Sequence, residues 1–382
     1  MKTKSKGHEF DEMYKNILHK KKFYLFGAGD YGNQFIKIMQ DEINICGYID
    51  NDKEKNGKFI NGIPCCILNE AEKDPSIGII VTMSQIARKA PIVQLNNENY
   101  KENIDYFIIE EFLSVYYVYK YNKVYFSSIS FLPSTICNLK CKHCLNFNPY
   151  AEKFYVREWE DLVRDVDLFF SCVDRIMLFH ISGGEPMLYK HTAELIKYIS
   201  DNYGERIDTL RTVTNGTVVP NKEMLETLSK CNVEVTVDDY RAAVPQYNEN
   251  FEQLISGLKK YNIRHYINSV DTWIDLAPER TDLSEYTEED MQNHFNNCCQ
   301  SWQELRDGKL YTCNYAAYAA VAGLCNDSKE EKYDLQKFSP NKRKELIEFR
   351  LGYTEKGYTN FCRHCLGFSD KNTNIVLPAV QV

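Results

Sequence analysis

Three cysteines on one short stretch are the residues of this sequence best suited to chemistry. Cys137, Cys141 and Cys144 stand in "TICNLKCKHCLNF" with the spacing C-x3-C-x2-C. An odd number of thiols does not suit disulfides, and a zinc site would need a fourth ligand, for which His143 is poorly placed. Three thiolates on one loop better suit a cubane iron–sulfur cluster, whose fourth iron then stays open for a substrate or a cofactor.

A glycine-rich turn comes 38 residues after the third cysteine. In "LFHISGGEPML" an apolar strand runs into Ser182-Gly183-Gly184-Glu185. Two glycines let the chain approach a ligand closely, and a carboxylate can bind an ammonium group. A tight turn with a capping glutamate is the plain alternative for this stretch alone. The cysteine triplet at this distance favours the ligand site.

The two motifs together resemble the signature of the radical S-adenosylmethionine (SAM) superfamily. The resemblance implies a partial (β/α)6 barrel over about residues 120–285, with SAM bound at the open iron of a 4Fe–4S cluster. It also implies cleavage of SAM to a 5′-deoxyadenosyl radical. His143 takes the place, before the third cysteine, where that family usually has an aromatic residue. The residues expected to contact SAM or its cluster are His143, Ser182, Gly183, Gly184, Glu185, Thr214 and Asn215.

Alternating strands and helices must position these groups. "TLRTVTNGT" predicts a strand that ends at Thr214 and Asn215, and "NVEVTVDDY" predicts one that ends at Asp238 and Asp239. In parallel α/β barrels the functional groups lie at the carboxyl ends of the strands. The candidates to face the substrate are therefore Asp238, Asp239, Arg241 and His265, although turn or salt-bridge roles would explain each of them equally well.

A second group of cysteines follows the predicted barrel. "CCQSWQELRDGKLYTC" and "FCRHCLGF" supply Cys298 or Cys299, Cys313, Cys362 and Cys365. Two ligands on a hairpin and two on a later knuckle could close a tetrahedral zinc site. The arrangement resembles the twitch domain, a shortened relative of the SPASM domain, which implies one auxiliary 4Fe–4S cluster instead. Cys325 and the unligated member of the adjacent pair remain as spare thiols.

The first part of the chain has a different pattern. "KKFYLFGAGDYGNQFIKIMQ" predicts a strand, a turn with Gly27, Gly29 and Gly32, and a helix, and the next strand ends at Asp50. This is the G-x-G-x-x-G arrangement of dinucleotide-binding domains. "GYIDNDKEKNGKFINGIPC" resembles the nucleotide-binding modules of polysaccharide-biosynthesis enzymes. It implies a nucleotide or nucleotide-sugar ligand at these four residues, or a domain that serves only as a scaffold.

We therefore predict an α/β protein of three domains. They are a Rossmann-like parallel sheet (residues 1–118), the partial barrel (119–288) and a small twitch-like auxiliary cluster domain (289–382). The net charge of -8 and the pI of about 5.6 argue against a nucleic-acid partner. No signal peptide or membrane-length apolar run is visible, so we expect a cytoplasmic protein with reduced cysteines.

The leading functional hypothesis is an oxidoreductase that removes hydrogen from a sugar or polyol. The auxiliary cluster would accept the second electron as the alcohol becomes a ketone, with Asp238 and Asp239 as catalytic candidates and a flavodoxin- or ferredoxin-type electron donor. The alternatives are an epimerase with Cys325 or the unligated one of Cys298 and Cys299 as hydrogen donor, a peptide-modifying enzyme, and a non-catalytic iron–sulfur or nucleotide-binding protein.

Overall fold

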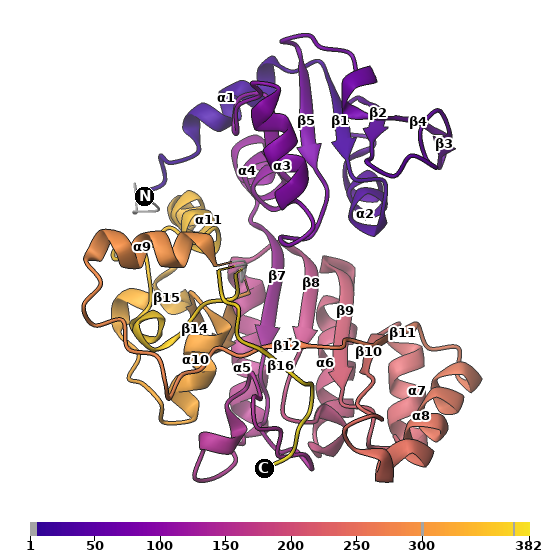
Figure 1. The fold of residues 1–382 in the computed structure, drawn as a ribbon, viewed down its shortest axis with the longest axis vertical. Coiled ribbons are helices and arrows are strands. Elements are labelled where there is room, and N and C mark those ends of the chain that lie inside the picture. Colours follow the sequence, from indigo (N-terminus) through magenta and orange to yellow (C-terminus); the bar gives the residue numbers. More distant parts are fainter. Residues whose placement is uncertain (1–5, 299–301, 370) are drawn as a thin grey trace. The chain divides into compact units, whose positions relative to one another are not determined.

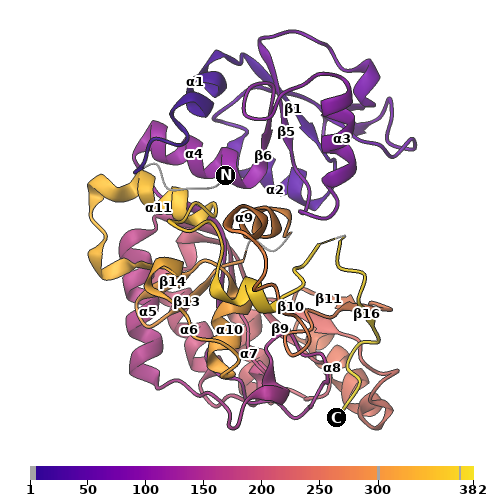
Figure 2. The same cartoon turned by 60° about the vertical axis from the view of Figure 1, so that its left-hand side comes forward.

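The computed structural model describes residues 6–298, 302–369 and 371–382. The chain divides into two compact units, residues 5–123 and 124–382, and each is a mixture of helices with largely parallel strands (Figures 1 and 2). The predicted boundary at 118 lies close to the division, whereas the one at 288 lies inside the second unit. Within the described residues, none of the helices has the length and apolar character that a membrane crossing requires.

The first unit is built on a six-stranded sheet in the order β3-β4-β2-β1-β5-β6. All neighbouring strands are parallel except the short β3–β4 hairpin. The elements are α1 (Asp11–His19), β1 (Lys22–Phe26), α2 (Asp30–Met39), β2 (Ile45–Ile49), β3 (Phe59–Ile60), β4 (Ile63–Cys66), β5 (Ile77–Val81), α3 (Lys89–Asn97), β6 (Tyr106–Ile108) and α4 (Ile109–Tyr121).

Aromatic packing joins the helices of this unit to its sheet. Phe112 of α4 contacts the rings of Phe23 at 5.5 Å and Phe107 at 5.9 Å, and Phe35 of α2 completes the group. All four rings are buried, and each buried aromatic ring removes a large apolar area from water. The central strand β5 is buried along its whole length, as a parallel strand covered on both faces should be.

The second unit is built on an eight-stranded sheet in the order β11-β10-β9-β8-β7-β13-β14-β15. Its first part alternates strand and helix: β7 (Tyr125–Phe131), α5 (Trp159–Cys172), β8 (Arg175–Ile181), α6 (Thr192–Tyr203), β9 (Ile207–Thr214), α7 (Lys222–Lys230), β10 (Glu234–Asp238), α8 (Asn248–Lys260) and β11 (His265–Asn268). These five strands are parallel to their neighbours in the sheet. Their carboxyl ends, and the loops that follow, therefore meet at one edge of the sheet.

The rest of the second unit extends this sheet on its other side. Its elements are β12 (Trp273–Ile274), α9 (Glu288–Asn297), β13 (Glu304–Arg306), β14 (Lys309–Tyr311), α10 (Asn314–Val321), β15 (Lys332–Asp334), α11 (Arg343–Arg350) and β16 (Ile375–Val376). Strand β13 pairs in parallel with β7, β14 pairs antiparallel with β13, and β15 pairs antiparallel with β14. A separate two-stranded sheet joins β12 and β16.

A buried acid holds β13 against β7. The side chain of Glu304 accepts hydrogen bonds from the Leu132 N–H at 2.8 Å and from the Tyr318 hydroxyl at 3.3 Å. The same hydroxyl contacts Ser130 and Ser182 at 2.6 and 3.1 Å. Burial raises the pKa of Glu304 to about 7. This polar network ties the strand that leads to the cysteine triplet to the segment that carries the second cysteine group.

Candidate functional site

The cysteine triplet lies on the loop that follows β7, at the edge where the parallel strands end. Short turns shape this loop: the Cys144 N–H donates to the Cys141 carbonyl at 3.1 Å, and the Leu139 N–H donates to Cys137 Sγ at 3.4 Å. The three cysteines pack in an apolar cluster with Leu139, Tyr240, Val244, Tyr247, Trp273 and Ala379. The loop thus presents three thiols in largely apolar surroundings.

Burial dominates the chemistry of these three thiols. It raises the pKa of Cys137 to about 12 and that of Cys141 to about 11, and it also raises the pKa of Cys144. A thiol in such surroundings becomes a thiolate only when a bound cation offsets the lost hydration. The triplet therefore fits a metal-containing cofactor better than it fits three independent nucleophiles.

The glycine-rich turn lies directly beside the cysteine loop. The Gly184 N–H donates to the Ser134 carbonyl at 3.0 Å, and the Glu185 N–H donates to the Ile136 carbonyl at 2.7 Å. A Cβ at Gly184 would lie 2.3 Å from the Thr135 carbonyl oxygen, far inside any permitted contact. Only glycine therefore allows the two loops to come this close. From the sequence, we expected the two glycines to allow a close approach to a ligand.

Glu185 joins the ends of two neighbouring strands. Its carboxylate accepts hydrogen bonds from the Asn215 N–H at 2.7 Å and the Met187 N–H at 3.0 Å. Burial raises its pKa to about 7. Asn215 in turn points its side-chain amide at Cys137 Sγ, 3.7 Å away, and Thr214 is buried beside it. The structure thus brings Glu185, Thr214 and Asn215 together with the cysteine triplet.

The two candidate acids after β10 have different surroundings. Asp238 accepts hydrogen bonds from the Tyr240 hydroxyl at 2.9 Å and the Asn268 amide at 2.7 Å, and burial raises its pKa. Asp239 is held by Arg241 at 2.8 Å, and this contact lowers its pKa. Tyr240 packs against the apolar cluster that contains Cys141. Asp238 is therefore hydrogen-bonded to a residue of this cluster, whereas Asp239 forms an ion pair.

The two histidines of interest contact neighbouring chain segments. His143 Nδ1 lies 3.2 Å from Asp275 Oδ2, and this carboxylate also accepts from Arg280. His265 Nδ1 lies 2.7 Å from the carbonyl oxygen of Ile263. His143 therefore ties the cysteine loop to the segment after β12.

Four cysteines from three separate segments line one pocket of the second unit. Cys298 ends α9, Cys313 precedes α10, and Cys362 and Cys365 stand on the turn at 360–365. Three of these sulfurs accept backbone N–H hydrogen bonds at 3.3–3.4 Å, from Phe368, Thr359 and Gly367. Such N–H donors are typical of the surroundings of metal-bound thiolates. Cys299, the rival of Cys298, lies outside the described residues.

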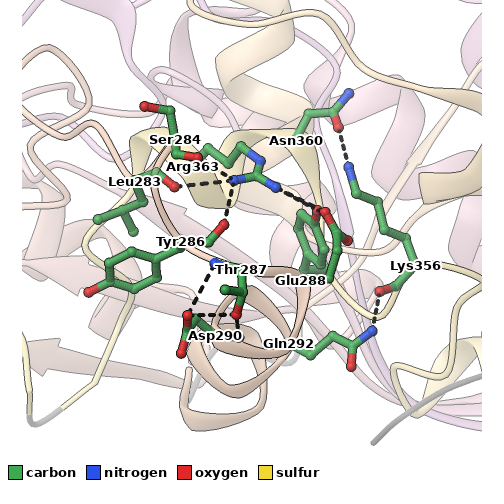
Figure 3. A network of polar contacts seen from close by, with 11 residues as sticks. Leu283, Ser284, Tyr286, Thr287, Glu288, Asp290, Gln292, Lys356, Asn360 and Arg363 are labelled. Atoms are coloured by element: carbon green, nitrogen blue, oxygen red, sulfur yellow. Dashed lines mark hydrogen bonds and ion pairs between the residues drawn. The ribbon is translucent and has the colours of Figure 1, made fainter.

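An arginine inside the C-x2-C knuckle positions that pocket. Arg363 donates to the carbonyl oxygens of Leu283 and Tyr286 at 3.2 and 3.3 Å, and pairs with Glu288 at 3.1 Å (Figure 3). Glu288 begins α9, whose C-cap residue is Cys298, and Thr287 and Asp290 form a capping box at its start. Arg363 thus holds the knuckle to the start of the helix that leads to Cys298.

An aromatic contact connects the two cysteine groups. Phe147, three residues after Cys144, meets Phe361, the neighbour of Cys362, with ring centroids 5.3 Å apart. Both rings belong to a buried apolar cluster that includes Cys365, and Cys325 packs against the same cluster. Cys325 does not line the four-cysteine pocket. Burial raises its pKa to about 12.

The three glycines of the Gly-rich turn in the first unit have different surroundings. Gly27 has φ +122°, and a Cβ at Gly32 would lie 2.3 Å from the Gly27 carbonyl oxygen, so these two shape the turn and the helix approach. Among the described residues, no atom lies within 4 Å of the position that a Cβ at Gly29 would take. Asp50 accepts from the Ala28 N–H at 2.9 Å and pairs with Lys55 at 2.9 Å. Gly27 and Gly32 thus shape the turn, and Asp50 holds it through the hydrogen bond from the Ala28 N–H.

The family comparison identifies the middle of the chain. Residues 131–287 match the model of the radical SAM superfamily. This segment is a radical SAM domain. It contains both the cysteine triplet and Glu185, and its family implies an enzyme with a 4Fe–4S cluster and SAM. The four-cysteine pocket is built from residues beyond the matched range.

Two curated proteins are similar to part of the chain. The GTP 3',8-cyclase of Pelotomaculum thermopropionicum is 32% identical over 112 residues, which are 28% of this chain and 32% of that protein. The probable GTP 3',8-cyclase of Methanocaldococcus jannaschii is 28% identical over 130 residues, 32% of this chain and 41% of that protein. The chain therefore spans only about a third to two fifths of the curated relatives that it matches.

Two solved structures illustrate the distant structural similarity. Native anSMEcpe with bound AdoMet and a peptide superposes with a TM-score of 0.42 at 17% identity, over 66% of this chain and 93% of that one. BtrN in complex with AdoMet and 2-DOIA has a TM-score of 0.37 at 14% identity, over 66% and 98% of the two chains.

Several residues around the radical SAM domain's cysteines escaped sequence reasoning. Tyr240 follows a predicted strand end and could have been chosen with Asp238. Nothing in the local pattern singled out Trp273, Asp275 or Gln381, because their positions depend on contacts between distant segments.

Proposed function

We propose that this protein is a radical SAM oxidoreductase that oxidises a hydroxyl-bearing carbon of a sugar-like small molecule to a ketone. The observation that carries the proposal is the second group of cysteines, which converges on one pocket in the same unit as the radical SAM domain. An oxidation of this kind must dispose of one electron after the hydrogen atom is removed. A second iron–sulfur cluster provides a place for that electron.

The residues of the radical SAM domain would bind the cluster and SAM and take up the hydroxyl proton. Cys137, Cys141 and Cys144 would hold the 4Fe–4S cluster, and Glu185 would face the amino group of SAM. When bound, SAM supplies a 5′-deoxyadenosyl radical that takes the hydrogen atom from the substrate carbon. Asp238 is the better-supported base for the hydroxyl proton, because burial raises its pKa whereas Arg241 neutralises Asp239.

The second cluster would be held by Cys298, Cys313, Cys362 and Cys365, with Cys299 as the alternative to Cys298. The backbone N–H groups around three of these sulfurs support a cluster more than a simple core of cysteines. Four protein ligands leave no open iron, so this cluster would exchange electrons and not bind substrate. A flavodoxin- or ferredoxin-type protein would supply the electron that cleaves SAM.

One experiment decides between oxidation and its rivals. The anaerobically reconstituted protein is incubated with SAM, dithionite and a panel of nucleotide sugars, polyols and GTP in deuterated water. A product two hydrogens lighter than its substrate supports the proposal, whereas one solvent deuterium on carbon would identify an epimerase. Cys325, which packs against the apolar cluster that includes Cys365, is the thiol to replace by alanine if deuterium is found on carbon. If no 5′-deoxyadenosine forms with any substrate, the proposal fails.

The first unit is proposed to bind the nucleotide part of such a substrate. The open space at Gly29, between two glycines that shape the turn, leaves room for a phosphate at the start of α2. Calorimetric titration with a nucleoside diphosphate tests this role, and Gly29→Asp should abolish any binding through charge and bulk. Absence of heat with the unmodified protein would leave the first unit as a scaffold.

A further inference from the structure

The last described segment of the chain lies along the cysteine loop. We call residues 375–382 the strap; in Figure 1 it is the yellow trace from β16 to the end marked C. It begins as β16, paired with β12. It then forms a short antiparallel ladder with the cysteine loop, where the Lys142 N–H donates to the Val380 carbonyl at 2.7 Å and the Val382 N–H donates to the Lys140 carbonyl at 2.9 Å.

One side chain of the strap contacts a cysteine of the triplet. Gln381 stands opposite Cys141 in the ladder. Its Nε2 donates to Cys141 Sγ at 3.4 Å and to the Ala379 carbonyl at 2.6 Å, while its Oε1 accepts from the Lys140 N–H at 2.7 Å. The amide thus holds the loop backbone and the sulfur in one fixed arrangement.

The strap adopts a costly backbone conformation to reach this position. Ala379 has φ +53°, in the left-handed region that a residue with a Cβ seldom occupies. Its side chain is fully buried against Leu139, Cys141 and Val244. Such conformations are unfavourable and persist where the surrounding contacts hold the backbone in place. Here the packing of Ala379 and the four hydrogen bonds between the strap and the cysteine loop hold this backbone conformation.

We infer that Gln381 is a positioning residue for the Cys141 ligand of the radical SAM cluster, and that the strap shields this ligand from solvent. The inference rests on the 4Fe–4S cluster that the radical SAM domain implies. An N–H group aimed at a ligand sulfur stabilises the more negatively charged, reduced cluster, so it raises the reduction potential. A strap that covers the sulfur also slows attack by chelators and oxidants.

The test uses the intact reconstituted protein without substrate. Gln381→Glu keeps an acceptor for the Lys140 N–H but cannot donate to Cys141 Sγ, and it adds a negative charge. Gln381→Leu removes all three side-chain hydrogen bonds at similar volume. Gln253→Glu, on an exposed face of α8, is the matched control. The cluster that responds to SAM is identified by electron paramagnetic resonance, its potential is titrated, and its loss to a chelator is timed.

We expect both Gln381 variants to lose the SAM-responsive cluster roughly 10-fold faster than the parent protein, the scale of lost outer contacts at metal sites. We also expect the potential to fall, most in Gln381→Glu, with Gln253→Glu unchanged. If both variants have the reduction potential of the parent protein and lose the cluster at the same rate, the inference is overturned. Circular dichroism verifies that the variants are folded.

Failure of the underlying assumption gives a different result. If the parent protein holds no SAM-responsive cluster, this inference and the proposed function are both overturned. A parent protein that holds the cluster but oxidises no alcohol would overturn the proposed reaction alone, because the potential and the loss rate are measured without substrate.

Discussion

Replacing Gly184 with alanine tests the close approach of the two loops of the radical SAM domain. The new Cβ would lie 2.3 and 2.4 Å from the carbonyl oxygens of Thr135 and Ile136, so backbone must move. Overpacking of this kind costs about 1–3 kcal/mol. The displacement also disturbs the hydrogen bonds that the Gly184 and Glu185 N–H groups donate, worth about 0.5–1.5 kcal/mol each. The loss of stability should therefore total roughly 2–6 kcal/mol.

Calorimetric melting of the intact chain measures this loss. A domain of this size shifts its melting temperature by about 2–4 °C per kcal/mol, so Gly184→Ala should melt about 4–24 °C lower. It should also incorporate less iron and bind SAM more weakly, because the cysteine loop moves with the turn.

Gly204→Ala is the matched control for this variant. Gly204 also lies in the second unit, has right-handed φ and ψ of -54° and -38°, and only Ser200 Oγ, at 3.7 Å, would meet its new Cβ. This change should be neutral, or should stabilise the protein by about 0.4–1 kcal/mol through the unfolded chain. If Gly184→Ala melts and binds SAM like the parent, the close approach of the two loops does not hold.

Three further variants test other parts of the site. Cys141→Ala should abolish 5′-deoxyadenosine formation, while Cys46→Ala in the first unit should leave it intact; equal activity would exclude the triplet as the cluster site. Cys362→Ala should lose about half of the bound iron and all turnover while retaining SAM binding, and full iron content would contradict a second cluster. The pKa of Glu304, about 7 in the folded protein against 4.5 as its ordinary value, means that the folded state holds the proton more tightly. Stability should therefore fall by about 3 kcal/mol as pH rises from 4.5 to 7, and Glu304→Gln should remove that slope in pH-dependent denaturant unfolding.

The sequence was most informative where the chemistry depends on local spacing. The five strands β7–β11 and the four sheet-building strands β1, β2, β5 and β6 follow from short apolar runs that end in turns. The three cysteines and the Gly184–Glu185 turn could be connected because their loops follow adjacent parallel strands. Long-range pairing could not be read in the same way. Nothing local predicts that β13 continues the sheet at β7, or that Gln381 reaches Cys141 across 240 residues.

Spacing also left the second cysteine group undecided between metals. What the fold adds is the set of backbone donors at its sulfurs and the Arg363 network that fixes the knuckle to α9. The N–H donors flank the C-x2-C motif, but Cys298 and the carbonyl oxygen of Leu283 that Arg363 contacts lie 70 and 80 residues before their partners. Such contacts have no periodicity, so a sequence analysis has no pattern to detect.

The pairing of β13 with β7 has a consequence for how this protein can be divided experimentally. Every residue of β7 is buried, and β13, with Glu304, covers one of its two edges. A fragment expressed from residue 124 to 288 would leave that edge with unpaired N–H and C=O groups along an apolar strand, which is a template for intermolecular pairing. Such a fragment should aggregate even though it holds all three cysteines of the triplet. The radical SAM domain therefore carries the cysteine triplet, but it needs β13 to cover the exposed edge of β7 in order to stay soluble.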